Sequence, residues 1–458
     1  MAIITHSTTT PERSNVLVNH KYLYPASAVV ALGGVLFGFD LVIISGTVPF
    51  FTKYFDLNEF STGWAVGCIN LGAAAGAVAA GKLSDVLGRK RLLILCAFLF
   101  AVTGIATGWA DTFTLFIIAR LLSGVAVGVA ALVCPMYIAE IAPSAIRGRL
   151  VTLYQLAIVT GLLLAYMSNY ALLNTGVNNW RWMFSSQAIP SLLFFLGLFF
   201  VPESPRWLIK KKKTDESFAV LQKIGGKTYA QEETDDIESS LKNETKEHLR
   251  DLFKPDVKHI IFIGIMVAVF SQADGQNSLF SYAPQIFADA GMAEDTAFLQ
   301  SVILGAINFV FTFIAIFSID KIGRKKLLTY GSMLLCIDAL VLAYCFWAGA
   351  ASYWILIFVL AFIAIYGATL GPVTWVILSE IFPNRIRGNA MALTTLSLWI
   401  ANFFTTASFP ILKENFGLPI TFAIHAGICF IYFLYVRTKI PETKGKSLEE
   451  IETLLVKR

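Results

Sequence analysis

Several polar side chains lie inside long apolar stretches of this sequence, where each is costly unless it has a partner or a ligand. They are the amides Gln155, Gln272, Gln276, Asn277 and Asn308, with the indoles of Trp375 and Trp399 at similar depth in their own stretches. An amide offers a hydrogen-bond donor and an acceptor together, and an indole offers an apolar face and one N–H. This chemistry suits an uncharged ligand rich in hydroxyl groups. The alternative for any single amide is a hydrogen bond between helices.

Two opposite charges, Asp40 and Arg120, also fall inside apolar stretches. Counted along helices, both lie roughly 10–17 Å from the same side of the membrane, so they are expected to meet. A lone buried carboxylate tends to take up a proton, whereas a nearby arginine favours the ionised form. We therefore predict that Asp40 exchanges a proton and that protonation loosens its pairing with Arg120. The alternative is a static structural ion pair.

Three further ionisable residues lie within apolar stretches. Asp274 is next to Gly275, where a helix can thin or unwind. Three interpretations of Asp274 remain open: it holds a hydroxyl of the ligand, it titrates, or it is neutral and hydrogen-bonded to a neighbouring helix. Asp338 and His425 are expected to make local hydrogen bonds only.

The chain around these residues has the composition of a membrane protein. Of its 458 residues, 56% are hydrophobic and only 15% are charged, and the mean hydropathy is +0.67. Apolar stretches of about 20 residues, the length of a membrane-spanning helix, occur at 24–51, 62–81, 92–110, 113–139, 150–170, 183–201, 258–288, 297–319, 327–349, 353–379, 389–411 and 416–437. Because these runs are too long for barrel strands, we predict an all-α membrane protein with 12 transmembrane helices.

Basic residues predict the orientation, because Lys and Arg concentrate in cytoplasmic loops. Alternate loops carry Lys82, Arg89, Lys90, Arg91, Arg147, Arg149, Lys321, Arg324, Lys325, Lys326, Arg385 and Arg387, against Lys53, Arg181 and Lys413 in the others. Both termini are therefore expected to be cytoplasmic, and the net charge of +5 needs no nucleic-acid partner. The six cysteines have no metal-binding spacing, so no metal or cofactor is expected. Compact loops and the absence of a large extracellular domain favour a cell membrane of the bacterial inner type. A monomer is expected.

The two halves of the chain repeat each other, a pattern typical of transporters. GKLSDVLGRK at 81–90 is echoed by SIDKIGRK at 318–325, AEIAPSAIRG at 139–148 by SEIFPNRIRG at 379–388, and PES at 202–204 by PET at 441–443. We therefore predict six-helix bundles at 1–205 and 258–438, a cytoplasmic helical linker domain at 206–257, and a cytoplasmic tail at 439–458.

The repeated loops gather acids, bases and glycines at neighbouring helix ends. Such sets can form salt bridges and complement helix N-termini, so we predict a cytoplasmic latch that is made in outward-open states and released in inward-open ones. Its predicted members are Asp85, Arg89, Glu140, Arg147 and Glu203 in the first half, and Asp320, Arg324, Glu380, Arg387 and Glu442 in the second. The alternative is that the positive charges only set the topology, which leaves the acids unexplained.

At these motifs the chain resembles the sugar porter family of the major facilitator superfamily. PESPRWL at 202–208 and PETKG at 441–445 are specific to sugar porters, whereas the loop at 81–90 is common to the superfamily. The resemblance spans essentially the whole chain and is greatest to bacterial proton-coupled xylose and hexose members, with a looser resemblance to facilitative glucose transporters. It implies the major facilitator fold, with 12 transmembrane helices in two pseudo-symmetric six-helix halves.

The resemblance also implies roles for individual residues. The family carries its sugar contacts at the positions of Gln155, Gln272, Asn277, Asn308 and Trp375, with Phe37 and Trp399 walling the cavity. Its proton-coupled members carry Asp and Arg at the positions of Asp40 and Arg120. This chain departs from the family pattern at Ser271 and Ser281, and also at Leu162 and Leu398, where close members carry glutamines. Hydrogen bonds are lost at these positions and space is gained.

We therefore expect a monosaccharide, a hexose or pentose, to cross the bilayer with a proton by alternating access. The first alternative is a facilitative sugar uniporter, which shares every site residue except the coupling role of Asp40. A second alternative is a transporter-like sugar sensor. It is less favoured because such proteins usually carry long cytoplasmic tails, whereas the tails of this chain are short. The sequence contains no nucleophile elbow, phosphate loop or paired-carboxylate site, so an enzyme is not expected.

Overall fold

The computed structural model describes residues 19–242, 252, 254, 257–383, 386–446 and 450. Its helices are α1 (His20–Tyr54), α2 (Glu59–Leu87), α3 (Arg89–Gly108), α4 (Phe113–Ile141), α5 (Arg147–Leu172), α6 (Asn179–Ser185), α7 (Ala188–Leu198), α8 (Pro205–Lys210), α9 (Thr214–Lys242), α10 (Lys258–Ala273), α11 (Gln276–Asp289), α12 (Glu294–Ile322), α13 (Arg324–Trp347), α14 (Ser352–Ala368), α15 (Leu370–Ile381) and α16 (Arg387–Lys439).

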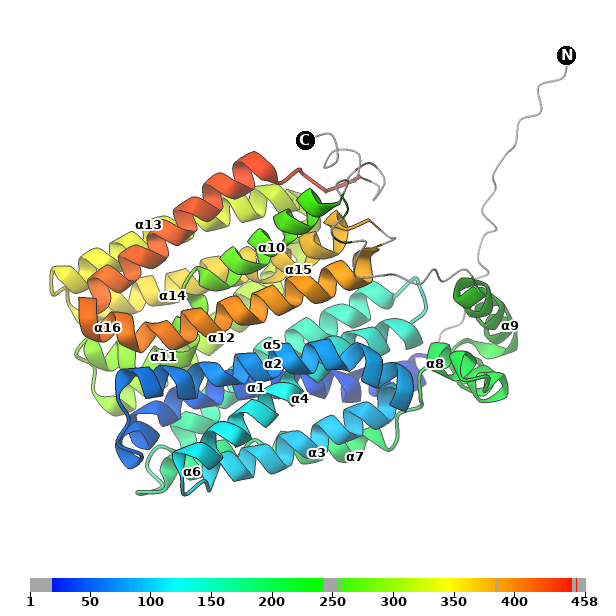
Figure 1. Ribbon diagram of the computed structural model, residues 1–458, viewed down its shortest axis with the longest axis horizontal. Helices are drawn as coiled ribbons and strands as arrows, with labels where there is room; N and C mark the ends of the chain where they lie inside the picture. Colours follow the sequence, from blue (N-terminus) through cyan, green and yellow to red (C-terminus); the bar gives the residue numbers. More distant parts are fainter. Residues whose placement is uncertain are drawn as a thin grey trace, which may run out of the picture.

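Within the described residues, ten helical stretches are long and apolar enough to cross a membrane. Two of them are the broken pairs α10–α11 and α14–α15. The 53-residue helix α16 turns back at Gly417 (φ 76°) and so crosses twice (Figure 1). A positive φ of this kind favours glycine because other side chains are strained there. Helices α6 and α7 together make the remaining crossing, which confirms the predicted all-α fold with 12 spans.

The helices form two bundles that lie side by side, α1–α7 and α10–α16 (Figure 1). They meet mainly where α2 packs on α16 and α5 packs on α12. Glycine allows this close approach: a Cβ atom at Gly63 of α2 would lie only 2.0 Å from the carbonyl oxygen of Ala407 on α16. The core of each half is apolar, and the six cysteines of the chain, three in each half, are all free and buried.

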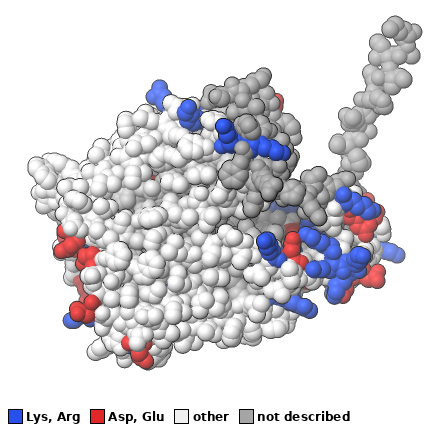
Figure 2. All heavy atoms as spheres, in the orientation of Figure 1, with Lys and Arg blue, Asp and Glu red and all other residues white. Residues whose placement is uncertain are grey.

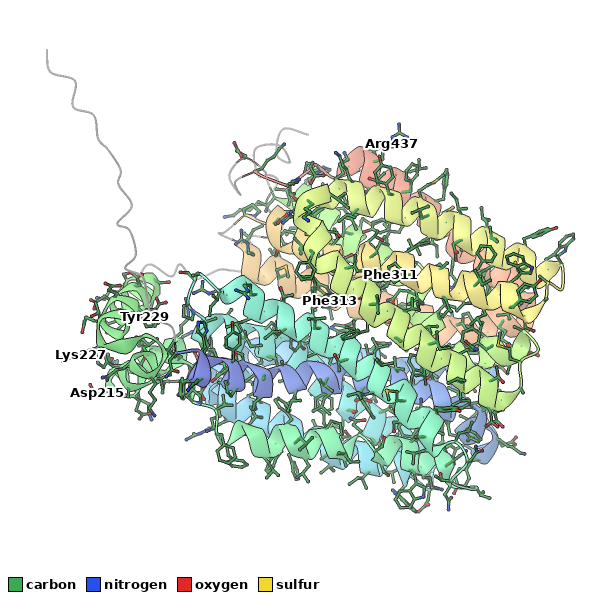
Figure 3. The ribbon with its side chains drawn as sticks, turned by 180° about the vertical axis from the view of Figure 1, so that it is seen from behind. Asp215, Lys227, Tyr229, Phe311, Phe313 and Arg437 are labelled. Carbon is green, nitrogen blue, oxygen red and sulfur yellow. The ribbon has the colours of Figure 1, made fainter. Side chains whose placement is uncertain are left out.

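Helices α8 and α9 lie at one end of the molecule, where α1 begins and α16 ends; we call this the linker end and the opposite end the far end (Figure 1). Helix α9 is two helices joined at Gly226 (φ 85°). It attaches to the first half, because the backbone N–H of Asn19 donates to the carbonyl oxygen of Ile224 at 2.8 Å. Asp215, Lys227 and Tyr229 mark this linker beside the bundle in Figure 3.

The outer surface fits a lipid environment. Most charged side chains on the face in Figure 2 lie towards the two ends, and the band between them is uncharged. Large apolar side chains are exposed around the bundle, among them Phe98, Leu193, Phe200 and Phe404. A soluble surface rarely exposes so much apolar area, whereas in a bilayer this area faces hydrocarbon.

Candidate functional site

All eight predicted ligand contacts line one cavity between the two halves, which we call the central cavity. They are Phe37, Gln155, Gln272, Gln276, Asn277, Asn308, Trp375 and Trp399. The cavity provides about 110 Å³ of space open to water. Helices α1, α2 and α5 supply one wall. The other wall comes from the second half, from helices α10, α11, α12, α14, α15 and α16.

A break between α10 and α11 places three of these amides. Gly275 has φ 101°, and a Cβ atom there would lie 2.8 Å from the ring of His425, so both conformation and space require glycine. Across the break, Nδ2 of Asn277 donates to Oε1 of Gln272 at 2.7 Å. The helix unwinds where the sequence predicted it would, and the freed turn points Gln272, Gln276 and Asn277 into the cavity.

Several buried polar atoms of the central cavity have no hydrogen-bond partner among the described residues. They are Oε1 of Gln276, Nε1 of Trp399, and the side-chain oxygens of Asn70 and Asn402. An unsatisfied buried polar group costs about 1–3 kcal/mol. The set therefore offers one donor and three acceptors to a guest with several hydroxyl groups.

The two walls of the central cavity differ in polarity. The second half supplies most of the polar groups, whereas the first half supplies Gln155 and Asn70 within an apolar wall. Trp399 packs on Phe37 across the cavity with ring centroids 5.7 Å apart. The wall also includes Leu162, Leu398 and Ser281, three of the four departures from the family pattern.

Further polar residues line this cavity that were not predicted from the sequence. They are Asn70, Thr312, Tyr366, Asn402 and Thr406. Asn70 of α2 donates through Nδ2 to Oγ1 of Thr406 on α16 at 3.3 Å, so this pair joins the two halves. The signal was present, since Asn70 and Asn402 are amides within predicted spans.

Asp40 and Arg120 form the predicted ion pair inside the first half. Nη1 of Arg120 lies 2.8 Å from Oδ1 of Asp40, and each side chain is only 1% exposed. The hydroxyl of Ser123 donates to the other carboxylate oxygen of Asp40. Phe37 and Leu41, which flank Asp40 on α1, line the central cavity. Through α1, the pair is thus one helical turn from the ligand wall.

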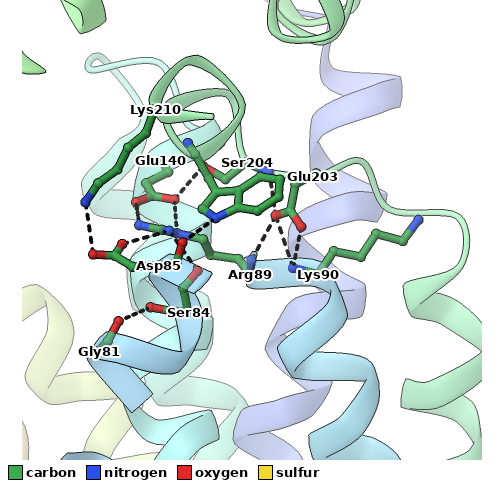
Figure 4. Close-up of polar contacts among 10 residues, drawn as sticks. Gly81, Ser84, Asp85, Arg89, Lys90, Glu140, Glu203, Ser204 and Lys210 are labelled. Atoms are coloured by element: carbon green, nitrogen blue, oxygen red, sulfur yellow. Dashed lines mark hydrogen bonds and ion pairs between the residues drawn. The ribbon is translucent and has the colours of Figure 1, made fainter. Parts of the chain in front are cut away.

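A network of charged groups ties helix ends together at the linker end of the first half (Figure 4). Arg89 of α3 pairs with Glu140 of α4 at 2.8 Å and with Asp85 of α2 at 3.3 Å. Glu203 accepts from the backbone N–H groups of Arg89 and Lys90 at 2.9 and 3.1 Å. A carboxylate at this position satisfies the free amides of the α3 N-terminus.

The second half repeats this network. Arg324 pairs with Glu380 at 3.0 Å, and Glu442 accepts from the backbone N–H of Arg324 at 3.0 Å. Arg147 and Arg387 instead donate to the backbone carbonyls of the residues five positions earlier, at 3.3 Å and 3.1 Å. The side chain of Asp320 lies outside the described residues. Each of these bonds joins residues of the same half.

A second cavity, the linker-end cavity, continues from the central one towards the linker end. It shares Phe37, Gln155, Pro372 and Trp375 with the central cavity, reaches Ile319 and Arg324, and holds about 410 Å³. Towards the far end, a hydrogen bond joins the two halves. There the hydroxyl of Tyr166 on α5 donates to the carbonyl oxygen of Phe280 on α11 at 2.7 Å. The central cavity is therefore continuous with the linker end.

Comparisons with known proteins agree with this geometry. The family model described as sugar (and other) transporter matches residues 26–455. The chain is 40% identical over 438 residues to the arabinose-proton symporter of Bacillus subtilis (strain 168), covering 94% of each chain. It is 37% identical over 480 residues to the D-xylose-proton symporter of Escherichia coli (strain K12), covering 96% of this chain and 97% of the relative.

The fold matches a solved structure of the same kind. The inward open conformation of the xylose transporter XylE from E. coli is similar with a TM-score of 0.86 at 35% identity, covering 94% of this chain and 100% of that one. The family match spans nearly the whole sequence, and relatives well above 30% identity cover it almost completely. The chain therefore belongs to the sugar transporter family of the major facilitator superfamily.

Proposed function

We propose that this chain carries a monosaccharide across a membrane together with a proton, by alternating access. One observation carries the proposal: a central cavity lined by uncharged amides of both halves and by two indoles of the second half lies one helical turn from the buried Asp40–Arg120 pair. The similar proteins are symporters of arabinose and of D-xylose with protons, which supports a pentose or hexose as the ligand.

In this proposal, the amides bind sugar hydroxyls and the aromatic rings pack on its C–H faces. Four amides donate hydrogen bonds to the sugar hydroxyls and accept hydrogen bonds from them. They are Gln272, Asn277 and Asn308 of the second half and Gln155 of the first. Phe37 and Trp399 provide the apolar surface. None of the described residues that line the central cavity is charged, which suits a neutral ligand. The proposed role is therefore transport and not catalysis.

Coupling follows from the ion pair. When Asp40 takes up a proton, its attraction to Arg120 weakens, because one of the two charges is gone. Helix α1 carries Asp40 and also three residues of the ligand wall, Phe37, Leu41 and Val42. A change in its packing against α4 therefore reaches the cavity, so proton and sugar favour the same transition.

Alternation requires two rigid units that move about the central cavity. We assign these to bundles 1–205 and 258–438, with 206–257 as a linker domain and 439–458 as a tail. The continuity of the two cavities, and the likeness to an inward open conformation, support an inward-facing state with the linker end and both termini cytoplasmic. A cell membrane, inner or plasma, is the proposed location, and a monomer the proposed unit.

The charged networks at the linker end are the proposed latch. In the inward-facing state their bonds lie within each half and hold the helix ends rigid. In the outward-facing state the same ends are brought together, and contacts between the halves form there. The sequence led us to expect these bonds to be released in inward-open states, but they are formed in this conformation. We therefore propose that they persist in both states and keep the helix ends of each half rigid.

Uptake by purified protein in liposomes tests the proposal. A panel of pentoses and hexoses is offered with and without an imposed pH gradient. We expect saturable uptake of one or a few sugars, accumulated above equilibrium only with the gradient. Variants Gln272→Ala and Asn277→Ala should raise KM about tenfold or more, the loss expected for about 1.5 kcal/mol of hydrogen bonding. Exchange without accumulation would favour a uniporter, and transport that ignores both variants would refute the assigned site.

A further inference from the structure

A second buried acid, Asp274, lies at the α10–α11 break and takes no part in the mechanism above. Gln272 and Gln276 on either side of it line the central cavity, while Asp274 is completely buried. Its Oδ1 accepts from the backbone N–H of Gln276 at 3.0 Å. Its Oδ2 has no hydrogen-bond partner among the described residues. This oxygen is therefore a buried acceptor with nothing to satisfy it.

Among the described residues, no lysine or arginine forms an ion pair with Asp274. The titratable groups near it are Tyr366 of α14 and His425, Cys429 and Tyr432 of α16, with Cys336 of α13 beyond Cys429. Asp40, in contrast, has a guanidinium at 2.8 Å. The two buried acids therefore differ in how their charge is compensated.

Helix dipoles do not replace the missing cation. Asp274 follows the last residue of α10 and comes two residues before the first residue of α11. The negative end of one helix and the positive end of the other therefore act on it in opposite senses. An isolated ionised carboxylate taken out of water costs several kcal/mol even after relaxation. A bound proton removes that charge and turns Oδ2 into a donor.

The backbone on both sides of Asp274 is held by one side chain. Nδ1 of His425 lies 3.2 Å from the carbonyl oxygen of Ala273, and its ring packs against Gly275. Because a carbonyl only accepts, Nδ1 carries the hydrogen and the ring is in the corresponding tautomer. A change of charge at Asp274 therefore acts on a short segment clamped between His425 and the cavity amides.

We propose that Asp274 is a second proton-binding site, in the second half, and that its proton stabilises the break from which Gln272 and Gln276 face the sugar. The effect on sugar binding rests on the proposed function, whereas the binding of a proton to Asp274 does not. It predicts that sugar affinity depends on pH by two routes, one through each half. As pH rises and the proton leaves Asp274, the break is strained and sugar affinity falls.

Infrared difference spectroscopy of the purified protein tests the proton directly. We expect pH-induced spectra to contain the carbonyl stretch of a protonated carboxyl that disappears in Asp274→Asn and persists in Asp40→Asn. Asp338 supplies a matched control, since it is also buried and has an unpartnered Oδ2 but lies on α13, away from the break. Spectra of Asp274→Asn that equal those of the wild type would overturn the proposal.

Sugar binding at different pH values tests the coupling. In the Asp40→Asn background, we expect affinity to fall by up to about tenfold per pH unit across the titration, the limit for one linked proton. Adding Asp274→Asn should make affinity independent of pH, whereas adding Asp338→Asn should leave the dependence in place. A dependence that survives in the Asp40→Asn, Asp274→Asn protein would refute the coupling. If no sugar binds to the wild type, the proposed function fails, and the infrared result alone decides the proton site.

Discussion

The hydroxyl of Tyr166 bridges the two halves at a point where the backbone needs a partner. It donates to the carbonyl oxygen of Phe280 at 2.7 Å. In a regular helix that carbonyl would accept from the residue four positions on, but this residue is Pro284, which has no N–H. Tyr166 lies on α5 and Phe280 on α11, so the bond exists only while the halves are closed towards the far end. Tyr166→Phe should therefore destabilise the inward-facing state selectively.

The size of the effect follows from the burial of this bond. Tyr166 is 1% exposed and Phe280 is 7% exposed, so removal of the hydroxyl leaves a buried carbonyl unsatisfied, at a cost of about 1–3 kcal/mol. When the far end opens, water can satisfy both groups in either protein, so the outward-facing state is little affected. A cost of about 1 kcal/mol changes the ratio of the two states about fivefold, and a larger cost changes it more.

Accessibility of a reporter cysteine measures this ratio. Val66 of α2 lines the central cavity, and the native cysteines are buried, so Val66→Cys reports opening to an impermeant maleimide added at the far end. We expect labelling at least about fivefold faster in Tyr166→Phe. Tyr154→Phe is the matched control, because its hydroxyl donates to the carbonyl of Ala130 within one half, at 3.2 Å. Equal labelling in Tyr166→Phe and the control would refute this reasoning.

Three other substitutions test separate parts of the structure. Asp40→Asn should keep sugar exchange but abolish uphill uptake and sugar-induced alkalinisation outside the vesicles or cells; proton movement equal to wild type would remove Asp40 from coupling. Gly275→Ala should lower the Tm of the detergent-purified protein, because φ is 101° and the new methyl group meets the ring of His425, whereas Gly427→Ala, which meets nothing within 4 Å, should not. Glu203→Gln should weaken the cap of α3 by about 1 kcal/mol, seen as a lower Tm and no change in KM.

The sequence allowed much of the site to be predicted because membrane burial makes polar residues conspicuous. Gln155, Gln272 and Asn308 stood out because an amide in a span needs a partner, and each lines the central cavity. The same rule applied to every span would have found Asn70 and Asn402. Thr406 could not be found in this way, because a threonine can satisfy itself on its own helix, as Thr406 does with the carbonyl of Asn402 at 2.8 Å.

Hydrogen bonds from a side chain of one half to the backbone of the other, such as that from Tyr166 to Phe280, could not be predicted from the sequence. Pro284 leaves the carbonyl of Phe280 without its helical partner, but which side chain meets that carbonyl depends on the register between α5 and α11. The charged loops give the converse case. Their composition pointed to Arg89 and Glu140 as neighbours, yet composition alone does not distinguish a bond within one half from a bond between halves. In this conformation the bond lies within one half.

The division of polar groups between the halves bears on how coupling works. The ion pair of Asp40 with Arg120 belongs to the first half, whereas most amides of the central cavity belong to the second. The effect of a proton bound in the first half must be transmitted to those amides through a contact between the halves. Phe37 on α1 and Trp399 on α16 make such a contact, with ring centroids 5.7 Å apart. Removing the Phe37 ring should therefore weaken coupling more than it weakens sugar binding, since the amides that hold the hydroxyls remain in place.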